Sequence, residues 1–299
     1  FRFVNYKYIL KFSKMKKFSI LALIIASVGM FLSCDKIPED QYLKDDASVW
    51  FGRKILVLDF TGHKCGNCPK GHRALNEIEE KYGEALVPVA VHCTFYGNVM
   101  RNVSPHTTDS TFNYDFRCEE GITLGGDDQS TGDLDLDAVP AALVNSFDVA
   151  HLNQSPNSWI SDFAKYYSTY PEYNIEIGTS YADSSINADI KVKPLVNGVS
   201  HKLKLAVYVI EDGIVGSQLD YEKPAGQQEI HNYVHNHVLR SSFSGVYGEE
   251  IAINGDEFEK SYSKAIKADW NVENCQVIAF VYDADTKEML QAEIKKVVE

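Results

Sequence analysis

The first half of the chain contains apolar runs separated by one clearly helical segment. Residues 54–60 (KILVLDF) form a short, nearly continuous apolar run, which is typical of a strand buried on both faces. Residues 86–93 (LVPVAVHC) form a second such run. Between them, a segment follows Pro69, ends at Gly83 and has apolar residues at helical spacing: Leu75, Ile78 and Tyr82. The pattern predicts two parallel strands joined by a right-handed helical crossover.

The same region continues with a polar insertion and a third strand. Residues 94–137 are polar and glycine-rich, and we interpret them as an insertion with some helix. Residues 139–147 (VPAALVNSF) predict a third strand, and residues 158–167 (SWISDFAKYY) predict a closing helix. Together these elements predict an α/β domain over residues 49–170.

Beyond Tyr170 the sequence changes to segments in which apolar and polar residues alternate. Five such segments are separated by turn residues: 173–182, 185–195, 201–211, 275–284 and 288–297. Several alternating strands without long helices favour an antiparallel sandwich. We therefore expect residues 171–299 to form a second, all-β domain with an immunoglobulin-like sandwich fold.

The N-terminal segment has the layout of a secretory signal peptide. A basic start at residues 15–17 (MKK) precedes an apolar run at residues 18–31, and residues 1–14 would be upstream translation. The run is shorter than the roughly 20 residues needed to span a bilayer, so a permanent transmembrane helix is the weaker interpretation. Ser33 directly before Cys34 resembles the lipobox of bacterial lipoproteins, in which the cysteine is lipidated. The alternative is a plain signal peptide with an incidental cysteine.

Removal of residues 1–34 would leave a strongly acidic mature chain. Residues 35–48 would then form a polar tether between the lipid and the fold. The mature part would carry 23 Lys and Arg residues against 42 Asp and Glu residues, a net charge of −19. A chain this acidic is not expected to bind nucleic acid through its phosphates.

Five cysteines remain if Cys34 is acylated, and because five is odd, at least one thiol is unpaired within the chain. They are Cys65, Cys68, Cys93, Cys118 and Cys275. In an oxidising compartment Cys65 and Cys68 could persist as a disulfide. Cys93 could pair with Cys118 or be a buried core thiol, and Cys275 is expected in the core.

Cys65 and Cys68 form a Cys-X-X-Cys motif, which metal knuckles, structural disulfides and redox centres all use. A zinc site needs two more ligands at workable spacing, and the chain has no second motif of this kind. His63 and His72 are close, but four ligands within ten residues that include a helix start would be awkward. The position before a helix favours a redox centre, because unpaired backbone N–H groups and the helix dipole stabilise a thiolate.

The residues around the motif have natural roles in thiol chemistry. Cys65, with its lowered pKa, would be the nucleophile, and Cys68, one turn later, would resolve the mixed disulfide. Asp59 ends the first apolar run, six residues before Cys65. A buried carboxyl group there, with a raised pKa, can take the proton of the resolving thiol and return it. The alternative is that Asp59 faces water at the strand end.

Two segments resemble thioredoxin-like proteins. The segment VLDFTGHKCGNCPK resembles their strand–motif–helix segment, with matching residues Asp59, Phe60, Cys65, Gly66 and Cys68. The segment AVPAALV resembles the one that carries their cis-proline. The resemblance implies a cis bond at Pro140 opposite the cysteine pair, and a Val139 backbone that is free to pair with an extended substrate.

Two positions depart from the thioredoxin-like pattern. Lys64 replaces the usual aromatic residue before the first cysteine, and Asn67 replaces the usual proline between the cysteines. The Lys64 charge beside Cys65 is expected to favour the thiolate further and to lie next to a bound substrate.

Nearly the whole mature chain also resembles the twenty-eight-kilodalton outer-membrane protein family of Gram-negative bacteria. The resemblance rests on the lipoprotein-like leader, on FTGHKCGNCPKGH and AVPAALVN, and on YVHNHVLR and VIAFVYDADTKEMLQAEIKKV in the C-terminal half. It implies attachment to the outer membrane through an N-terminal lipid and a thioredoxin-like first domain. It does not imply an established activity, nor the side of the membrane that the protein faces.

A group of three histidines is the remaining candidate for metal binding: His231, His235 and His237. On a strand, His235 and His237 would share one face, as two imidazole ligands require. No carboxylate follows at a fixed offset, so exposed or core-edge histidines are favoured over a metal site. No nucleotide, haem or flavin motif is present, and we expect no cofactor other than the cysteine pair.

Two functions fit these observations. The first is a lipid-anchored oxidoreductase that exchanges thiols and disulfides with exported proteins or with a redox partner. Its site residues would be catalytic Cys65, Cys68 and Asp59, and substrate-binding Lys64, Val139 and Pro140. The second is a binding or structural lipoprotein, at the surface or in the periplasm, with a static disulfide and no catalysis. Its motivation is that a redox function does not explain the β domain.

Overall fold

Two parallel strands joined by a helix begin the α/β part of the molecule. The computed structural model describes residues 49–93, 110–112, 114–127, 130–198, 201–253 and 255–298. Strand β1 (Ile55–Thr61) pairs in parallel with β2 (Leu86–His92), and helix α2 (Pro69–Tyr82) connects them. Strand β3 (Ala141–Val144) pairs antiparallel with the other edge of β1. These elements confirm the strands and the helix that the apolar pattern predicts.

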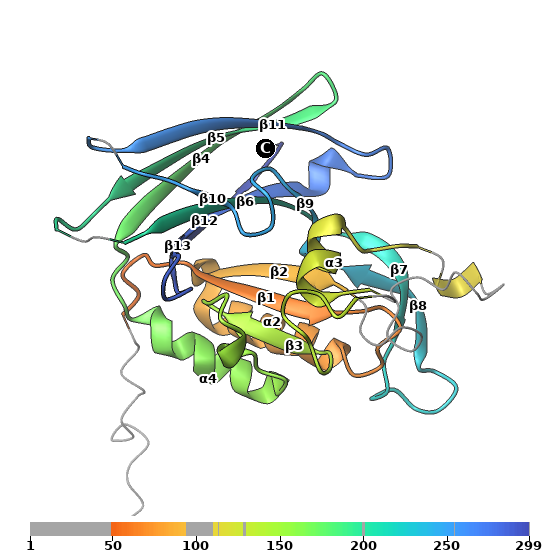
Figure 1. The fold of residues 1–299 in the computed structure, drawn as a ribbon. Helices are drawn as coiled ribbons and strands as arrows, with labels where there is room; N and C mark the ends of the chain where they lie inside the picture. The colour runs from red at the N-terminus through yellow and green to blue at the C-terminus, as the bar shows by residue number, and fades with distance from the viewer. Residues whose placement is uncertain are drawn as a thin grey trace, which may run out of the picture. The chain divides into compact units, whose positions relative to one another are not determined.

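The sheet continues past β2 into the C-terminal half of the chain (Figure 1). Ala90 of β2 lies opposite Val238 of β9, and the Ala90 N–H donates to the carbonyl of His237 at 2.8 Å. Antiparallel strands then follow in the order β9, β6, β12 and β13, and β10 pairs with β6. Their bounds are Val238–Ser242 (β9), Leu203–Glu211 (β6), Cys275–Asp283 (β12), Met289–Lys296 (β13) and Glu249–Glu250 (β10). The described residues therefore contain one mixed, eight-stranded sheet.

Two smaller antiparallel sheets complete the β structure of the described residues. One places β5 between β4 and β11, and the other is a hairpin of β7 and β8. Their bounds are Tyr173–Ala182 (β4), Ser185–Pro194 (β5), Phe258–Ala265 (β11), Ile214–Leu219 (β7) and Glu229–His235 (β8). The fold is mostly β with mixed sheets and few helices. The five alternating segments are strands, as predicted, whereas β7, β8, β9, β10 and β11 were not among those predicted.

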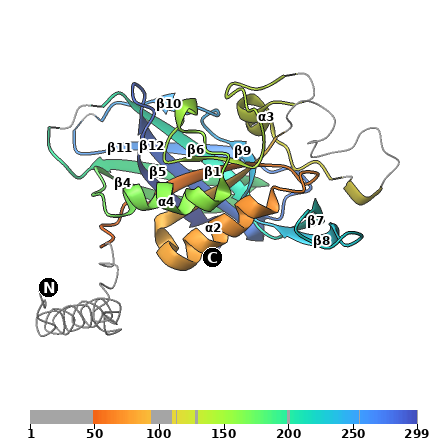
Figure 2. The same cartoon turned by 90° about the horizontal axis from the view of Figure 1, so that it is seen from below.

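Two helices cover one face of the β1–β2–β3 part of the sheet (Figure 2). Helix α4 (Pro156–Tyr167) begins two residues before the predicted start and packs beside α2. The core that they enclose includes Ile55, Val57, Leu75, Ile78, Val144, Trp159 and Phe163. The remaining helical segments are α3 (Glu119–Gly125) and the short 3-10 turns Gly83–Ala85, Ser110–Phe112, Val149–His151 and Val272–Asn274. Helix α3 lies in the predicted insertion and confirms that it contains some helix.

Strand β6 contributes to two separate cores through its alternating side chains. Leu205, Val207 and Val209 pack with the three-stranded sheet, in a core that includes Ile190 and Val192. Ala206, Tyr208 and Ile210 join the core beneath β1 and β2, which includes Leu58, Val89 and Leu124. Because successive side chains of a strand point to opposite faces, one strand links both cores.

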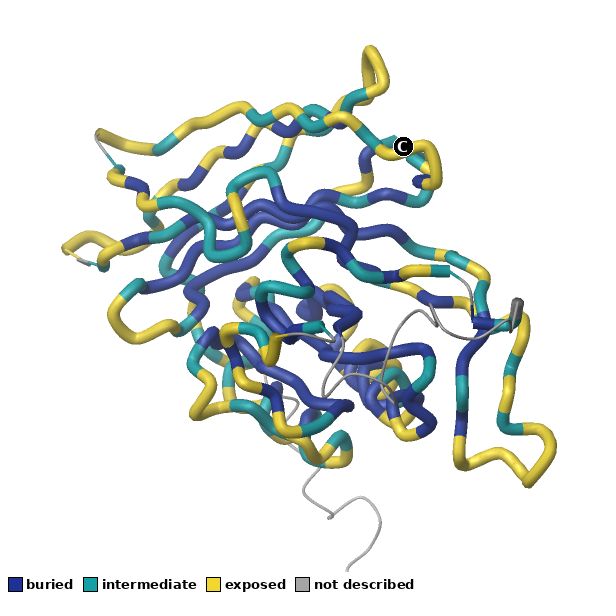
Figure 3. Tube along the Cα trace, turned by 45° about the vertical axis from the view of Figure 1, so that its right-hand side comes forward, coloured by how far each residue is buried: buried dark blue, intermediate teal, exposed yellow. Residues whose placement is uncertain are grey.

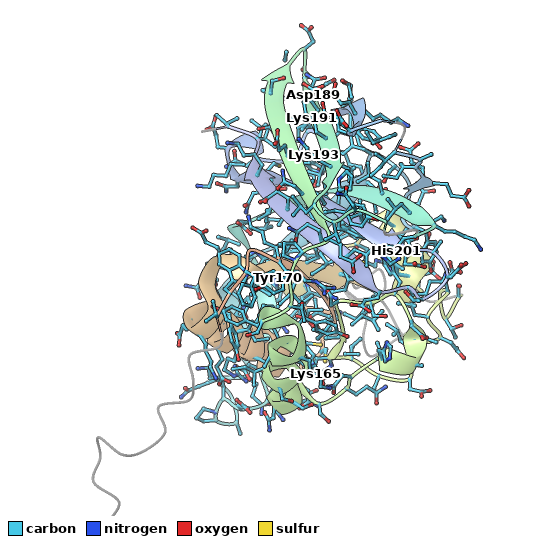
Figure 4. The ribbon with its side chains drawn as sticks, turned by 90° about the vertical axis from the view of Figure 1, so that its left-hand side faces the viewer. Lys165, Tyr170, Asp189, Lys191, Lys193 and His201 are labelled. Carbon is cyan, nitrogen blue, oxygen red and sulfur yellow. The ribbon has the colours of Figure 1, made fainter. Side chains whose placement is uncertain are left out.

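The outward face of the three-stranded sheet is polar. Asp189, Lys191 and Lys193 of β5 are exposed and alternate with buried Ile190 and Val192. Figure 4 shows the three charged side chains in a row along this strand. This alternation confirms a half-buried antiparallel sheet and indicates a solvated outer surface.

Several predictions concern residues outside those that the structure describes. The signal peptide, the tether and Cys34 lie in residues 1–48, and residues 94–109 of the insertion also lie outside. The domain boundary near residue 170 and the immunoglobulin-like classification stay predictions. Among the helices of the described residues, none combines the length and the apolar character needed to cross a membrane.

Candidate functional site

The cysteine pair lies between β1 and α2, where the sequence places it. β1 ends at Thr61, Cys68 caps the N-terminus of α2, and Pro69 is the first helical residue. The loop of residues 62–68, called the cysteine loop below, is closed by two backbone bonds. The Cys65 N–H donates to the Gly62 carbonyl at 3.0 Å, and the Cys68 N–H donates to the Cys65 carbonyl at 3.2 Å. Proline at the first helical position suits this geometry because no N–H needs a partner there.

The two thiols are free and have opposite protonation tendencies. A hydrogen bond from Cys68 lowers the pKa of Cys65, against burial, and backbone bonds from Asn67 and Cys68 lower it further. Burial, followed by the hydrogen bond to Cys65, raises the pKa of Cys68. These shifts favour ionisation of Cys65 before that of Cys68, which is the order that the redox prediction requires.

Asp59 lies beneath the pair on β1 and has no solvent-exposed surface. Burial raises the pKa of its carboxyl group well above the usual range, and the charge of Cys65 raises it further. The alternative that Asp59 faces water at the strand end is therefore wrong. A carboxyl group that keeps its proton at higher pH can exchange it with a neighbouring thiol.

The segment at Val139 and Pro140 faces Cys65 from the start of β3. The Val139–Pro140 peptide bond is cis, as expected. The Cys65 thiol donates to the Val139 carbonyl, with 3.5 Å between sulfur and oxygen. The structure thus brings together the predicted site residues Cys65, Cys68, Val139 and Pro140. Lys64 lies beside them, with its Nζ 5.4 Å from the centroid of the Phe112 ring.

His72 is a site residue whose role the sequence does not indicate. Its Nε2 lies 3.0 Å from Thr61 Oγ1 and 3.8 Å from Asp59 Oδ2, and its Nδ1 lies 2.7 Å from the hydroxyl of Tyr233. The Thr61 hydroxyl in turn bonds to Cys68. Burial lowers the pKa of His72 to about 3, so the imidazole is neutral at neutral pH. His72 lies four residues after Cys68 and therefore on the same face of the helix, and this spacing is the sequence feature that could have indicated its place beside the cysteine pair.

A polar cavity of about 90 Å³ lies behind the cysteine pair. Its lining includes Asp59, His72, His92, Tyr233, His235 and His237. A cavity of this size with several polar groups suits ordered water. Water there would connect Asp59 with His72 and with the edge of the β7–β8 hairpin.

The histidine group does not have the geometry expected for metal binding. His235 is the last residue of β8, whereas His237 lies in the following turn with φ 58°, so the two do not share a strand face. His231 is exposed on β8, and burial lowers the pKa of His235 to about 2. Within the described residues, no group of three or more His, Cys, Asp and Glu side chains could hold a metal ion.

The other cysteines of the described chain, Cys93, Cys118 and Cys275, are buried and form no disulfide. Burial raises the pKa of Cys93, and it raises the pKa of Cys118 and of Cys275 to about 12. Cys118 caps helix α3 by accepting a hydrogen bond from the Gly121 N–H at 3.4 Å. The possible Cys93–Cys118 disulfide is therefore absent, and Cys275 is a core thiol as expected.

These differences predict selective alkylation of the protein. At about pH 7.5 we expect iodoacetamide to modify Cys65 at least tenfold faster than Cys93 or Cys275, because the thiolate is the reactive form. The pH at which the alkylation rate of Cys65 reaches half of its maximum should be lower than for an ordinary cysteine, because the pKa of Cys65 is lowered. Peptide mass analysis of a pH series measures both quantities. Equal rates for the three thiols would contradict the prediction.

Comparison with known proteins places the chain in a family. The family model described as outer membrane protein Omp28 matches residues 127–299. The chain belongs to the Omp28 family. This membership confirms the predicted family and the predicted lipid-anchored, outer-membrane localisation. The match begins after the cysteine pair, so it carries no information about Cys65 and Cys68.

Solved structures add information about the fold. HBP35 of Porphyromonas gingivalis is 17% identical, with 83% of this chain and 76% of that chain covered and a TM-score of 0.59. A domain of the outer membrane lipoprotein Omp28 from Porphyromonas gingivalis is 23% identical, with 44% and 91% covered and a TM-score of 0.32. The first likeness extends to the fold alone. No curated protein matches the chain in sequence.

Proposed function

We propose that this Omp28-family protein exchanges thiols and disulfides with exported proteins through Cys65 and Cys68. The observation that carries the proposal is the hydrogen bond between the two cysteines at the start of α2, which lowers the pKa of Cys65, together with the buried Asp59 carboxyl group that interacts electrostatically with Cys65. A thiolate held in this way is the attacking species of disulfide exchange.

The exchange proceeds in two balanced steps. The Cys65 thiolate attacks one sulfur of a substrate disulfide, forms a mixed disulfide, and releases the other substrate sulfur as a thiolate. Cys68 then loses its proton and attacks Cys65 Sγ, which forms the Cys65–Cys68 disulfide and releases the second substrate thiolate. The substrate gains two electrons and the pair loses two. A dithiol partner protein would reduce the pair again, and the reverse sequence would oxidise a substrate dithiol.

The neighbouring groups have defined tasks in this scheme. Asp59 would take the Cys68 proton before the second attack, through Thr61, His72 or cavity water. Val139 and Pro140 would hold an extended substrate segment opposite Cys65, and Lys64 would contact that segment. The cysteine pair is the only redox group the proposal requires.

A thioredoxin-like first domain is part of the proposal. Its support is the parallel β1–α2–β2 unit with β3 antiparallel on the other edge of β1, and the cysteine pair at the start of α2. The membrane partner would be reached through a lipid on Cys34, and the protein partners would be exported thiols or a redox partner. Nucleic acid is not a partner in this proposal, because the mature chain is acidic.

A second candidate function has one observation in its favour. Cys65 is only 1% exposed, so its thiol is not open to a folded substrate in this arrangement. A binding or structural lipoprotein would have no need for an accessible thiol, and its cysteine pair would serve as a static bridge when oxidised.

The reduction potential of the pair separates the two functions. We expect a value between roughly −120 and −270 mV, the range of exchange catalysts, because the stabilised Cys65 thiolate favours the reduced form. The protein is equilibrated against glutathione and dithiothreitol buffers and the oxidised fraction is read by alkylation and mass. A value below about −300 mV would mark a structural bridge and favour the second function.

A further inference from the structure

The tip of the β7–β8 hairpin lies directly on the cysteine loop. The Leu219 N–H donates to the His63 carbonyl at 2.9 Å, and the Tyr221 N–H donates to the Gly66 carbonyl at 2.8 Å. Figure 1 shows this hairpin beside the end of β1 from which the loop departs. Leu219 and Tyr221, two positions apart in the hairpin, thus bond to the backbone of the cysteine loop. An added strand bonds to the edge strand of a sheet in the same way.

Side chains of the hairpin strengthen this contact. Gln218 is fully buried, and its Nε2 donates to the Cys65 carbonyl at 3.1 Å and to the Gly62 carbonyl at 3.3 Å. The Tyr221 ring packs on Gly66 so closely that a Cβ at Gly66 would lie 2.4 Å from it. Glycine at this position of the motif is therefore required by the hairpin contact.

Two ion pairs join the hairpin to helix α2. Arg73 Nη1 lies 3.1 Å from Asp220 Oδ2, and Arg73 Nη2 lies 2.5 Å from Glu222 Oε2. On β8, the Tyr233 hydroxyl bonds to His72 of the same helix at 2.7 Å. The hairpin thus contacts both sides of the cysteine pair, the loop and the helix.

The hairpin contact accounts for the poor accessibility of the cysteine pair. Cys65 is 1% exposed and Cys68 is fully buried. In disulfide exchange the substrate S–S bond must reach the thiolate and line up with it, so the attacking cysteine needs an open path to solvent. By contrast, the outer side of the hairpin is open, with Val215 and Val234 both more than half exposed. Figure 3 shows the exposed tip of this hairpin and its partly buried strands.

We propose that residues 218–222 are a latch that fills the substrate site of the cysteine loop. Opening of the latch exposes Cys65 and frees the carbonyls of His63 and Gly66 for the backbone of an incoming extended polypeptide. Any polypeptide can supply these donors, so the substrate class is a disulfide within an extended protein segment. This assignment of a substrate rests on the proposed exchange function, whereas the latch itself rests on the contacts alone.

The latch is tested by loosening its contacts without touching the cysteines. The variant combines Gln218→Ala, Asp220→Asn and Glu222→Gln, and the matched control is Glu229→Gln, an exposed acid on β8. We expect iodoacetamide to modify Cys65 at least tenfold faster in the latch variant than in the wild type or the control. Hydrogen exchange should show faster exchange of the Leu219 and Tyr221 amides in the same variant.

Two outcomes would overturn the latch. One is a Cys65 rate in the latch variant within twofold of the wild type. The other is an equal rise at Cys93 and Cys275, which would reflect general loosening of the fold. Because alkylation requires no exchange, a reduction potential below about −300 mV would refute the proposed function and leave this result in place.

The substrate class is tested in the same latch variant. We compare the reduction of a ten-residue peptide disulfide with that of cystamine, which lacks a peptide backbone. Release of the latch should raise the rate for the peptide at least fivefold more than the rate for cystamine. An equal rise for both would show that the opened loop offers access alone and would overturn the polypeptide assignment.

Discussion

Substitution of Cys65 by serine is expected to reduce disulfide exchange to the background rate, whereas Cys68→Ser is expected to accumulate a mixed disulfide on Cys65. A serine hydroxyl at position 65 stays protonated at neutral pH and cannot attack sulfur. Without Cys68 the first step still occurs but the covalent intermediate cannot be resolved. Non-reducing electrophoresis followed by peptide mass analysis identifies the trapped species and its attachment site.

Cys118→Ser is the matched control for these cysteine variants. It also removes one thiol, but Cys118 belongs to the cap of α3 rather than to the pair. Serine is a preferred N-cap residue, so this variant should fold and should exchange at the wild-type rate. If Cys65→Ser kept wild-type exchange, the reaction would have to use another thiol and the proposed mechanism would be wrong.

Local sequence patterns were sufficient to predict the elements that carry the cysteine pair. The apolar runs at β1 and β2 have the length and continuity of buried strands, and the spacing in α2 is helical. The motif at the start of α2 and the resemblance around Pro140 then locate four site residues. The predictions of β1, α2 and β2 succeeded because each depends on neighbouring residues in sequence, whereas the roles of the site residues stay predictions.

Strand β9 illustrates why other elements were missed. Its sequence, VLRSS, is short and contains Arg240, yet all five residues are buried. Arg240 Nε lies 3.1 Å from Glu211 Oε2, and its Nη2 lies 2.7 Å from Asp269 Oδ2. A buried charge is tolerated when partners compensate it, and those partners are distant in sequence. Hydrophobic periodicity cannot reveal such a strand.

The contact between the hairpin and the cysteine loop was unpredictable for a related reason. The hairpin lies between β6 and β9 in the chain, and β9 pairs with β2. Because β9 lies beside β2, the hairpin that precedes β9 lies at the end of the sheet where the cysteine loop follows β1. The change of pattern near residue 170 predicts two separate domains, so nothing in the sequence indicates a redox role for the C-terminal half. Tyr233 and Gln218 were missed as site residues for this reason.

Replacement of Asp59 by asparagine is expected to stabilise the protein at neutral and higher pH. Neither carboxyl oxygen of Asp59 has a hydrogen-bond partner among the described residues, and its nearest basic neighbour is the neutral imidazole of His72. The ionised form is therefore poorly compensated, and the pKa of Asp59 is raised in the folded state. An asparagine has nearly the same shape and carries no charge at any pH.

The sign of the pH dependence follows from the raised pKa. The folded state binds the Asp59 proton more tightly than the unfolded state, so the associated stability is fully present below the unfolded pKa of about 3.9. It is lost as the pH rises through the folded pKa, by about 1.4 kcal/mol per pH unit. The difference between Asp59→Asn and wild type should be smallest near pH 4 and should grow toward pH 8, as urea unfolding measures. A difference that is constant across this range would contradict the raised pKa.

The same substitution should slow the second step of exchange by about 10²-fold, the usual contribution of a general base. Alkylation of Cys65 should change little, since Cys68 and the loop backbone hold its thiolate. Asp189→Asn, on the exposed face of β5, is the control and should alter neither stability nor rate. A variant that gains stability and loses exchange identifies Asp59 as a carboxyl group retained for proton transfer at the expense of stability. A gain in stability with an unchanged rate would instead favour the binding or structural function.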